Sequence, residues 1–370
     1  MLLRAASRSS ADGDVVGEVT ALARAHGPID PELVAAATRA WSANTVRAFL
    51  SDLALWNAWC RRQAVPAGAP TPSDVARYIR MLAGVEPGHG EGYRAAATIE
   101  RYLVNIGWAY RMAGLDDPTR APLVRLELKG ARQARGVRQR QARAIRFKGD
   151  VTDLDEPAFG LALSNLLAAC RRDLLGLRDR ALLRVAYDSG CRRSELVAIE
   201  VAHVDNPDRD GAGTLFIPKS KTDREGEGQV AYLSPPTMRA VADWREKAGL
   251  DAGALFRRVL LHFDGTVHSV GRAGLHPNSV SLIYRRLIAA AFDRGLLGEM
   301  SEAELSRCLQ AVSSHSIRVG VAQDSLAAGE SLAAIMQAYR WRDPKTVMRY
   351  GAKLAAKSGT SARLAKRFAS

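Results

Sequence analysis

The first residues whose types and spacing suggest chemistry are Arg192 and Glu195, at an expected helix start. Positions i and i+3 of a helix lie on one face, so the guanidinium and the carboxylate can pair. At this spacing the two residues more often form a surface ion pair than part of a catalytic site. The pair alone therefore does not indicate a catalytic site, and other residues of the chain must be considered with it.

A second pair, His315 and Arg318, has the same spacing. An imidazole beside a guanidinium can hold two oxygens of one phosphate. Two arginines such as Arg192 and Arg318 can neutralise the charge that grows in a pentavalent transition state. Taken alone, a helix start followed by a surface arginine explains this pair equally well.

A third group places Tyr350 nine residues after Trp341, with the helix start Asp343-Pro344 between them. A tyrosine is usually a core or interface residue with a satisfied hydroxyl. Residues 214–218 and 229–233 are predicted to be short strands around a polar hairpin tip, which carries Lys219 and Lys221. A lysine with a pKa lowered by nearby arginines can act as a general acid, and either lysine fits.

In their order along the chain, six of these groups resemble the functional set of the tyrosine recombinase (phage integrase) family: Arg192, Lys221, His315, Arg318, Trp341 and Tyr350. The resemblance covers nearly everything from about residue 40 to 355, including segments 56–60, 315–320 and 335–338. Six roles in the right order are specific, although each motif alone is weak.

The resemblance implies that Tyr350 attacks a DNA phosphate and forms a 3′-phosphotyrosyl bond, with no need for ATP or metal. The sequence has neither a GxxxxGK[ST] loop nor the clustered carboxylates of a two-metal nuclease. Lys221 takes the acid role over Lys219, because the family carries its acid in a Lys-Thr pair, and Glu195 orients His315 or Arg192. The non-bridging oxygens are held by four groups: Arg192, His315, Arg318 and the Trp341 indole N–H.

The chain departs from the family pattern at two places near this set. Tyr339 and Arg340 stand where the family usually has small residues before the Trp, so the packing behind Tyr350 is expected to differ. Cys191 takes an apolar position, and Arg193 adds a charge near the phosphate site. Neither departure changes the expected reaction class.

The fold class is mainly α, because Ala and Leu recur at helical spacing and strand-like runs are few. From Thr237 onward the helical pattern continues, with glycine-bearing interruptions at 265–274. The resemblance implies a two-domain DNA clamp, with a helical core-binding domain and a mostly α catalytic domain that contains a small antiparallel sheet. The expected divisions are a flexible arm at 1–30, the core-binding domain at 31–130, a basic linker at 131–150 and the catalytic domain at 151–370 with a C-terminal exchange helix.

By the same resemblance, helices of both domains enter the DNA major groove, where Asn and Arg suit adenine and guanine edges. The implied partner is double-stranded DNA with inverted-repeat sites, held by a head-to-tail ring of four protomers. The candidate DNA-binding residues are Asn44, Arg47, Arg94 and Arg101 in the first domain and Asn278, Ser281, Arg285 and Arg286 in the second. For any single one of them, a solvated helix face is an equally good explanation.

Charge and cysteine usage agree with a nucleic-acid partner in a reducing compartment. The formal net charge is +14, which attracts polyanions. The sequence contains no run of about 18 apolar residues, so it gives no indication of a membrane span. The four cysteines form no CxxC pair, so neither a zinc site nor a disulfide framework is expected, which fits a cytoplasmic location. By the resemblance, a nucleoid-associated protein of bacterial, phage or plasmid origin is expected. The alternatives are a type IB topoisomerase-like enzyme, a non-catalytic DNA-binding protein on the same scaffold, or an RNA-binding or structural basic protein.

Overall fold

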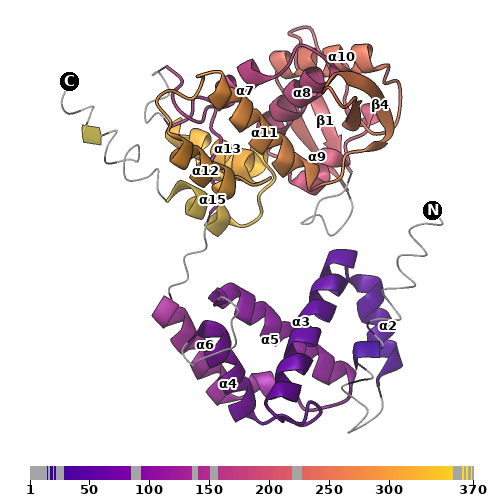
Figure 1. Cartoon of the computed structure of the whole chain (residues 1–370), viewed down its shortest axis with the longest axis vertical. Coiled ribbons are helices and arrows are strands. Elements are labelled where there is room, and N and C mark those ends of the chain that lie inside the picture. Colours follow the sequence, from indigo (N-terminus) through magenta and orange to yellow (C-terminus); the bar gives the residue numbers. More distant parts are fainter. Residues whose placement is uncertain are drawn as a thin grey trace. The chain divides into compact units, whose positions relative to one another are not determined.

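The computed structural model divides the chain into two compact units, Met1–Arg140 and Gln141–Ser370 (Figure 1). The structure describes residues 15, 17–19, 21, 29–84, 93–135, 141–150, 157–218, 227–352, 361, 364–365 and 368. Most of the described chain is helical, which confirms the predicted fold class.

The first unit is built from helices. They are α2 (Pro31–Ala40), α3 (Ala43–Arg62), α4 (Pro72–Ala83), α5 (Ala96–Met112), the 3-10 helix η1 (Pro118–Arg120) and α6 (Pro122–Arg135). Helix α4 begins with a capping box, in which Thr71 and Asp74 exchange hydrogen bonds between side chain and backbone. It ends at Gly84, whose φ of 70° is a left-handed conformation that glycine adopts without strain.

The predicted apolar stripe of α3 forms the centre of this unit. Phe49, Leu53, Trp56 and Cys60 are all fully buried. The Trp56 indole donates a hydrogen bond to the Tyr110 hydroxyl (3.2 Å), so the one polar atom of the ring is satisfied inside the core.

Part of the expected N-terminal arm belongs to this core. Val15 and Val19 are buried in the same hydrophobic cluster as α3, and the Asn57 amide donates to Glu18 (3.4 Å). Of the arm predicted at 1–30, residues 1–14, 16, 20 and 22–28 lie outside the described residues.

The second unit combines helices with two antiparallel hairpins. The helices are α7 (Leu163–Ala169), α8 (Leu174–Ser189), α9 (Arg193–Val197), η2 (Val201–His203), α10 (Pro235–Ala248), α11 (Ser279–Asp293), α12 (Glu302–Ala311), α13 (Ser316–Ala327), α14 (Leu332–Ala338) and α15 (Pro344–Gly351). The hairpins pair β1 (Gly213–Ile217) with β2 (Gln229–Leu233), and β3 (Arg257–Leu261) with β4 (Val267–Gly274).

The first hairpin confirms the predicted strands, whereas the second replaces an expected interruption in a helical pattern. Strand β4 is mostly half-buried or exposed, so it carries no clean alternation of apolar and polar residues. Its pairing with β3 also has register shifts, which the local sequence does not reveal.

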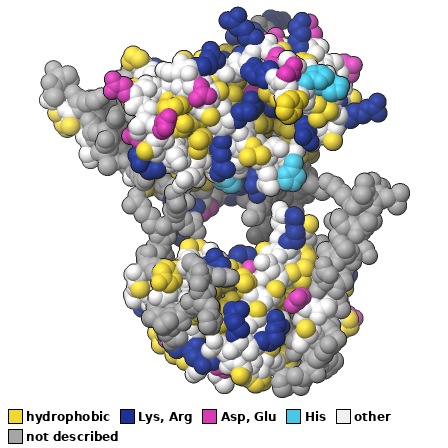
Figure 2. Space-filling view, in the orientation of Figure 1, with side chains coloured by type: hydrophobic (Ala, Val, Ile, Leu, Met, Phe, Trp, Pro, Cys, Tyr) yellow, Lys and Arg dark blue, Asp and Glu magenta, His cyan; other side chains and the backbone are white. Residues whose placement is uncertain are grey.

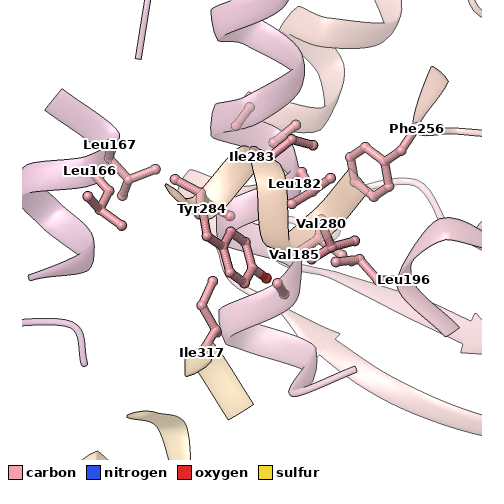
Figure 3. Packing of buried hydrophobic residues seen from close by; sticks show 14 of the residues in the cluster. Leu166, Leu167, Leu182, Val185, Leu196, Phe256, Val280, Ile283, Tyr284 and Ile317 are labelled. Carbon is pink, nitrogen blue, oxygen red and sulfur yellow. The ribbon is translucent and has the colours of Figure 1, made fainter. Parts of the chain in front are cut away.

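The core of the second unit lies around α8 and α11. Figure 3 shows Leu182 and Val185 of α8 close to Val280, Ile283 and Tyr284 of α11. All five side chains are buried. This packing fixes the C-terminal end of α8, from which the first candidate catalytic residue follows.

Residues 131–150, expected as a basic linker, are divided between two structures. Residues 131–135 complete α6, while 141–150 belong to the second unit and hydrogen-bond within it. Residues 136–140 lie outside the described residues. There Asp324 of α13 accepts from the Arg146 guanidinium (2.6 Å), the Phe147 amide (2.8 Å) and the Tyr187 hydroxyl (2.6 Å). A buried carboxylate with three donors anchors α13 to both this segment and α8.

Close packing at Gly320 completes that anchor. A side-chain Cβ at this position would lie 1.9 Å from the Ile145 carbonyl oxygen, so only glycine allows the approach. The position of α13, which carries Arg318 and directly follows His315, thus depends on the segment that enters the unit.

Candidate active site

The turn between α8 and α9 presents Arg192. Gly190 ends α8 with a φ of 56°, and Arg192 is the residue that precedes α9. Glu195 accepts from the Arg192 backbone amide and from its guanidinium, both at 2.8 Å. Because the Glu195 side chain is buried, this pair is better shielded from water than a surface ion pair.

Helix α13 brings Arg318 against the same turn. The Arg318 guanidinium is buried, donates to the Gly190 carbonyl and lies 4.6 Å from the centroid of the Trp341 ring. Burial and the nearby Arg192 charge lower the pKa of Arg318 to about 10, with opposing contributions from Glu195 and Tyr350. Arg318 therefore stays charged at neutral pH, and its charge is poorly solvated.

His315 precedes α13 at the edge of this group. Part of its side chain is exposed, yet the surrounding protein displaces enough water to lower its pKa below the ordinary value. The charges of Arg318, Arg193 and Arg192 lower the pKa further. His315 is consequently neutral at pH 7 and presents one nitrogen as a donor and one as an acceptor.

Trp341 lies in the connection between α14 and α15, and Tyr350 lies in α15. Asp343 caps α15 and Tyr350 lies on its last turn, where the Tyr350 carbonyl accepts from the Gln323 side chain of α13 (3.0 Å). The two aromatic rings meet edge to face, with centroids 6.0 Å apart. The Trp341 indole nitrogen is buried and, among the described residues, has no hydrogen-bond partner.

The departures at Tyr339 and Arg340 produce a tight connection between α14 and Trp341. A Cβ at Gly190 would lie 2.9 Å from the Tyr339 ring, so this ring packs directly on the turn before Arg192. Arg340 has a φ of 57°, a conformation that costs a non-glycine residue about 1–3 kcal/mol. Its guanidinium is buried and approaches the Cys191 sulfur at 3.5 Å.

The structure thus brings together six of the seven predicted catalytic residues: Arg192, Glu195, His315, Arg318, Trp341 and Tyr350. Lys221, and its rival Lys219, lie outside the described residues. The prediction left open whether Glu195 contacts His315 or Arg192, and the hydrogen bonds place it on Arg192. Gln323 was not predicted, because only the fold brings it to the backbone of Tyr350.

In the first unit, the candidate DNA-binding residues have contacts of different strength. Arg47 donates to Asn44 on the same exposed helix face, a local bond that DNA can replace. Arg101 pairs with the buried Asp52 (3.0 Å). Arg94 is half-exposed beside the undescribed segment 85–92.

In the second unit, the four candidates on and before α11 already bind other protein groups. Asn278 accepts from Arg193 (3.1 Å), and Ser281 accepts from the Ser314 amide (3.0 Å). Arg285 donates to the Val312 carbonyl (3.0 Å). Arg286 donates to Asp179, which is fully buried.

Basic side chains are spread over the visible face of each unit in Figure 2. Within the described ranges, no cluster of His, Cys, Asp and Glu has the makings of a metal site. The described helices likewise include none with the length and apolarity that a bilayer crossing requires.

Comparison with known proteins gives consistent matches. A protein-family model described as the phage integrase family matches residues 162–357. The recombinase Cre of Escherichia phage P1 is 28% identical over 338 residues, which span 88% of this chain and 89% of Cre. An integrase/recombinase XerD homolog of Selenomonas ruminantium is 26% identical, over 83% of this chain and 81% of the relative.

The fold also matches a solved structure. The site-specific recombinase XerH, bound to a palindromic difH substrate in a post-cleavage complex, superposes with a TM-score of 0.56 and 12% sequence identity. The match covers 90% of this chain and 84% of XerH. At this identity, the likeness supports a common fold.

Proposed function

The chain belongs to the phage integrase family and is a tyrosine site-specific recombinase, and from this premise we propose how its residues act. Tyr350 cuts a DNA strand by forming a 3′-phosphotyrosyl bond, and strands are exchanged through a Holliday junction at paired inverted-repeat sites. The observation that carries the proposal is the convergence of Arg192, Arg318 and Trp341 beside Tyr350.

The phosphate fits the electrostatics of this group. Burial and the charge of nearby Arg192 lower the pKa of Arg318. An anion bound between the two guanidinium groups would therefore reduce their electrostatic repulsion. Trp341 has a buried indole N–H that lacks a hydrogen-bond partner within the described part of the chain. A non-bridging phosphate oxygen supplies the missing acceptor.

The cleavage step exchanges one phosphate ester for another. The Tyr350 oxygen bonds to phosphorus while the bond between phosphorus and the 5′-oxygen breaks. Neutral His315 gives its N–H to a non-bridging oxygen, and its other ring nitrogen takes up the tyrosine proton. Lys221 gives a proton to the leaving oxygen. The new ester keeps the energy of the phosphodiester, so the 5′-hydroxyl of a second strand reverses the step without ATP or metal.

Glu195 is a positioning residue in this scheme. It binds both the backbone amide and the guanidinium of Arg192, which fixes where that charge lies. A fixed charge stabilises a transition state better than one that must reorganise.

Four protomers on two DNA sites give the assembly that reciprocal exchange requires. XerH, which shares this fold, is bound to a palindromic substrate, and this supports inverted repeats as the target of the present chain as well. In our proposal the C-terminal residues after 352 dock on the neighbouring protomer.

The test is capture of the covalent intermediate. Wild-type protein and Tyr350→Phe are incubated with fragmented DNA of the source replicon and denatured in SDS, and the DNA that stays attached is sequenced. We expect adducts with the wild type alone, mapping to one inverted repeat. Tight, salt-sensitive binding without an adduct would instead favour a non-catalytic DNA-binding protein.

A second measurement separates recombination from topoisomerase activity. The recovered site is placed twice on a supercoiled plasmid, and the products are analysed for both linkage and topology. Deletion or inversion between the two sites supports the recombinase. Relaxation of plasmids regardless of the site, with no exchange, would indicate a type IB topoisomerase.

A further inference from the structure

Arg340 is a buried cation with an unusual backbone and an incomplete set of partners. Its side chain is 8% exposed, and its φ of 57° falls in the left-handed region that favours glycine. One terminal nitrogen, Nη2, lies 3.5 Å from the Cys191 sulfur. The other, Nη1, is buried and has no hydrogen-bond partner in the described part of the chain.

The surroundings of Arg340 belong to the proposed phosphate site. Cys191 directly precedes Arg192, and Trp341 directly follows Arg340. Arg340 is also near enough to Arg318 for its charge to lower the pKa of Arg318. The guanidinium is therefore a buried charge close to Arg318 and to the residue that precedes Arg192, in an interior that screens charge poorly.

A structural role alone explains this arrangement badly. A thiol is a weak acceptor, and burying a guanidinium against it and against other cations opposes folding. An apolar side chain, or glycine, would fill or relax the same position without that penalty. The positive charge becomes favourable when the phosphate reaches its pentavalent transition state, which carries close to two negative charges. Opposite charges attract strongly across an interior that contains little water.

We propose that Arg340 is a third positive charge of the phosphate site, a positioning residue that holds the turn before Arg192 through Cys191 and adds its field to those of Arg192 and Arg318. The inference rests on the proposed strand-cutting activity. It adds a buried cation, Arg340, that is not among the six residues on which the family resemblance rests.

The experiment measures single-turnover cleavage of the recovered DNA site, made with either a normal scissile phosphate or a methylphosphonate. A methylphosphonate lacks one negative oxygen, so it depends less on positive charge. For Arg340→Met we expect cleavage of the normal site to fall about 10- to 100-fold, which is less than the roughly 100- to 1,000-fold loss of one direct donor, because Arg340 acts through its field and through Cys191. The loss should shrink several-fold on the methylphosphonate, relative to wild type on the same DNA.

Two further variants separate charge from folding. Arg340→Lys keeps the charge, and we expect it to retain activity within about 5-fold of wild type. Arg340→Gly removes the charge but suits the backbone conformation, so its cleavage should fall although its melting temperature stays near that of wild type.

The outcomes also distinguish this inference from the proposed function. An equal loss of cleavage on both kinds of phosphate, or full activity of Arg340→Met and Arg340→Gly, would overturn the role of Arg340 alone. Wild-type protein that leaves the normal site uncut would overturn the strand-cutting activity, and this inference with it.

Discussion

Two groups of arginines in the second unit are stabilised in opposite ways. Around the site, Arg192, Arg318 and Arg340 lie close enough for their charges to oppose one another, and Arg318 has a lowered pKa. Along α8 and α11, Arg178 and Arg286 share the two carboxylate oxygens of Asp179. The first group has three positive charges and, among the described residues, one paired carboxylate, Glu195 on Arg192, so it carries an electrostatic strain that a phosphate can relieve. In the second group both guanidinium groups bond the same buried carboxylate, and the excess charge lies on Arg286, which is partly exposed to water.

The difference shows how arginines for structure and arginines for chemistry can be told apart in one molecule. A guanidinium that is bonded to a buried carboxylate, with no second buried cation beside it, supports the fold and has little left to offer a ligand. A guanidinium that is buried among other cations destabilises the free protein and gains when an anion arrives. The following predictions test this contrast, beginning with the largest effect.

The largest effect is expected from removal of the shared carboxylate. Asp179 is fully buried, and Arg178 binds it through Nε (3.0 Å) and Nη2 (2.6 Å). Asp179→Ala leaves the Arg178 charge buried without a bonded carboxylate, so the free energy of unfolding should fall by about 3–5 kcal/mol. Denaturant titration of the purified variant measures it.

The matched control replaces both charges at once. Arg178→Met combined with Asp179→Leu removes the pair and fills its volume with apolar atoms, and we expect most of the lost stability to return. If Asp179→Ala unfolds at the same denaturant concentration as wild type, the pair does not support the fold and the contrast fails.

A smaller effect concerns the ionisation of His315. Its pKa is lowered first by displacement of water and then by Arg318, Arg193 and Arg192, so Arg193→Met should raise the pKa part of the way back towards 6.5. NMR titration of the histidine ring signals follows this change. The acid limb of the cleavage rate should move to higher pH in the same variant, since the base form of His315 is then lost earlier on acidification.

The pKa of His315 also links pH to stability. The unfolded chain binds its proton at a higher pH than the folded chain, so this residue reduces stability as pH falls below about 6.5 towards the folded pKa. Arg193→Met should weaken that dependence. Replacement of Arg209, an exposed arginine in the loop before β1, serves as the control and should leave the titration of His315 unchanged.

Much of this organisation could be predicted from sequence, where a local pattern records it. The spacing of Phe49, Leu53 and Trp56 predicts a buried helix face, because helical periodicity is a short-range property, and all three are buried. The catalytic set could be predicted because its members keep a fixed order, and the structure gathers every described member.

Other features depend on contacts between distant parts of the chain. Arg286 was a reasonable candidate for DNA binding, but its partner Asp179 lies 107 residues earlier and no local pattern connects them. Arg340 resembles a surface charge in the sequence, and only the packing of the α14–Trp341 connection against Cys191 shows that it is buried. Long-range ion pairs and backbone conformations of this kind are set by tertiary structure.

The smallest effect is expected at Arg286, where structure and sequence suggest different roles. Its guanidinium already donates to Asp179, a carboxylate with no exposed surface, and that carboxylate offsets much of the charge that a DNA phosphate would neutralise. Arg286→Met should therefore leave the salt dependence of DNA binding unchanged. Arg47→Met, at a residue bonded within its own exposed helix, should lower the slope of log K against log salt by about one if Arg47 contacts a phosphate. Binding isotherms at several salt concentrations compare the two variants, and a slope lowered by about one in Arg286→Met would show that α11 gives up its internal ion pair to DNA, which would remove the distinction between the two groups of arginines.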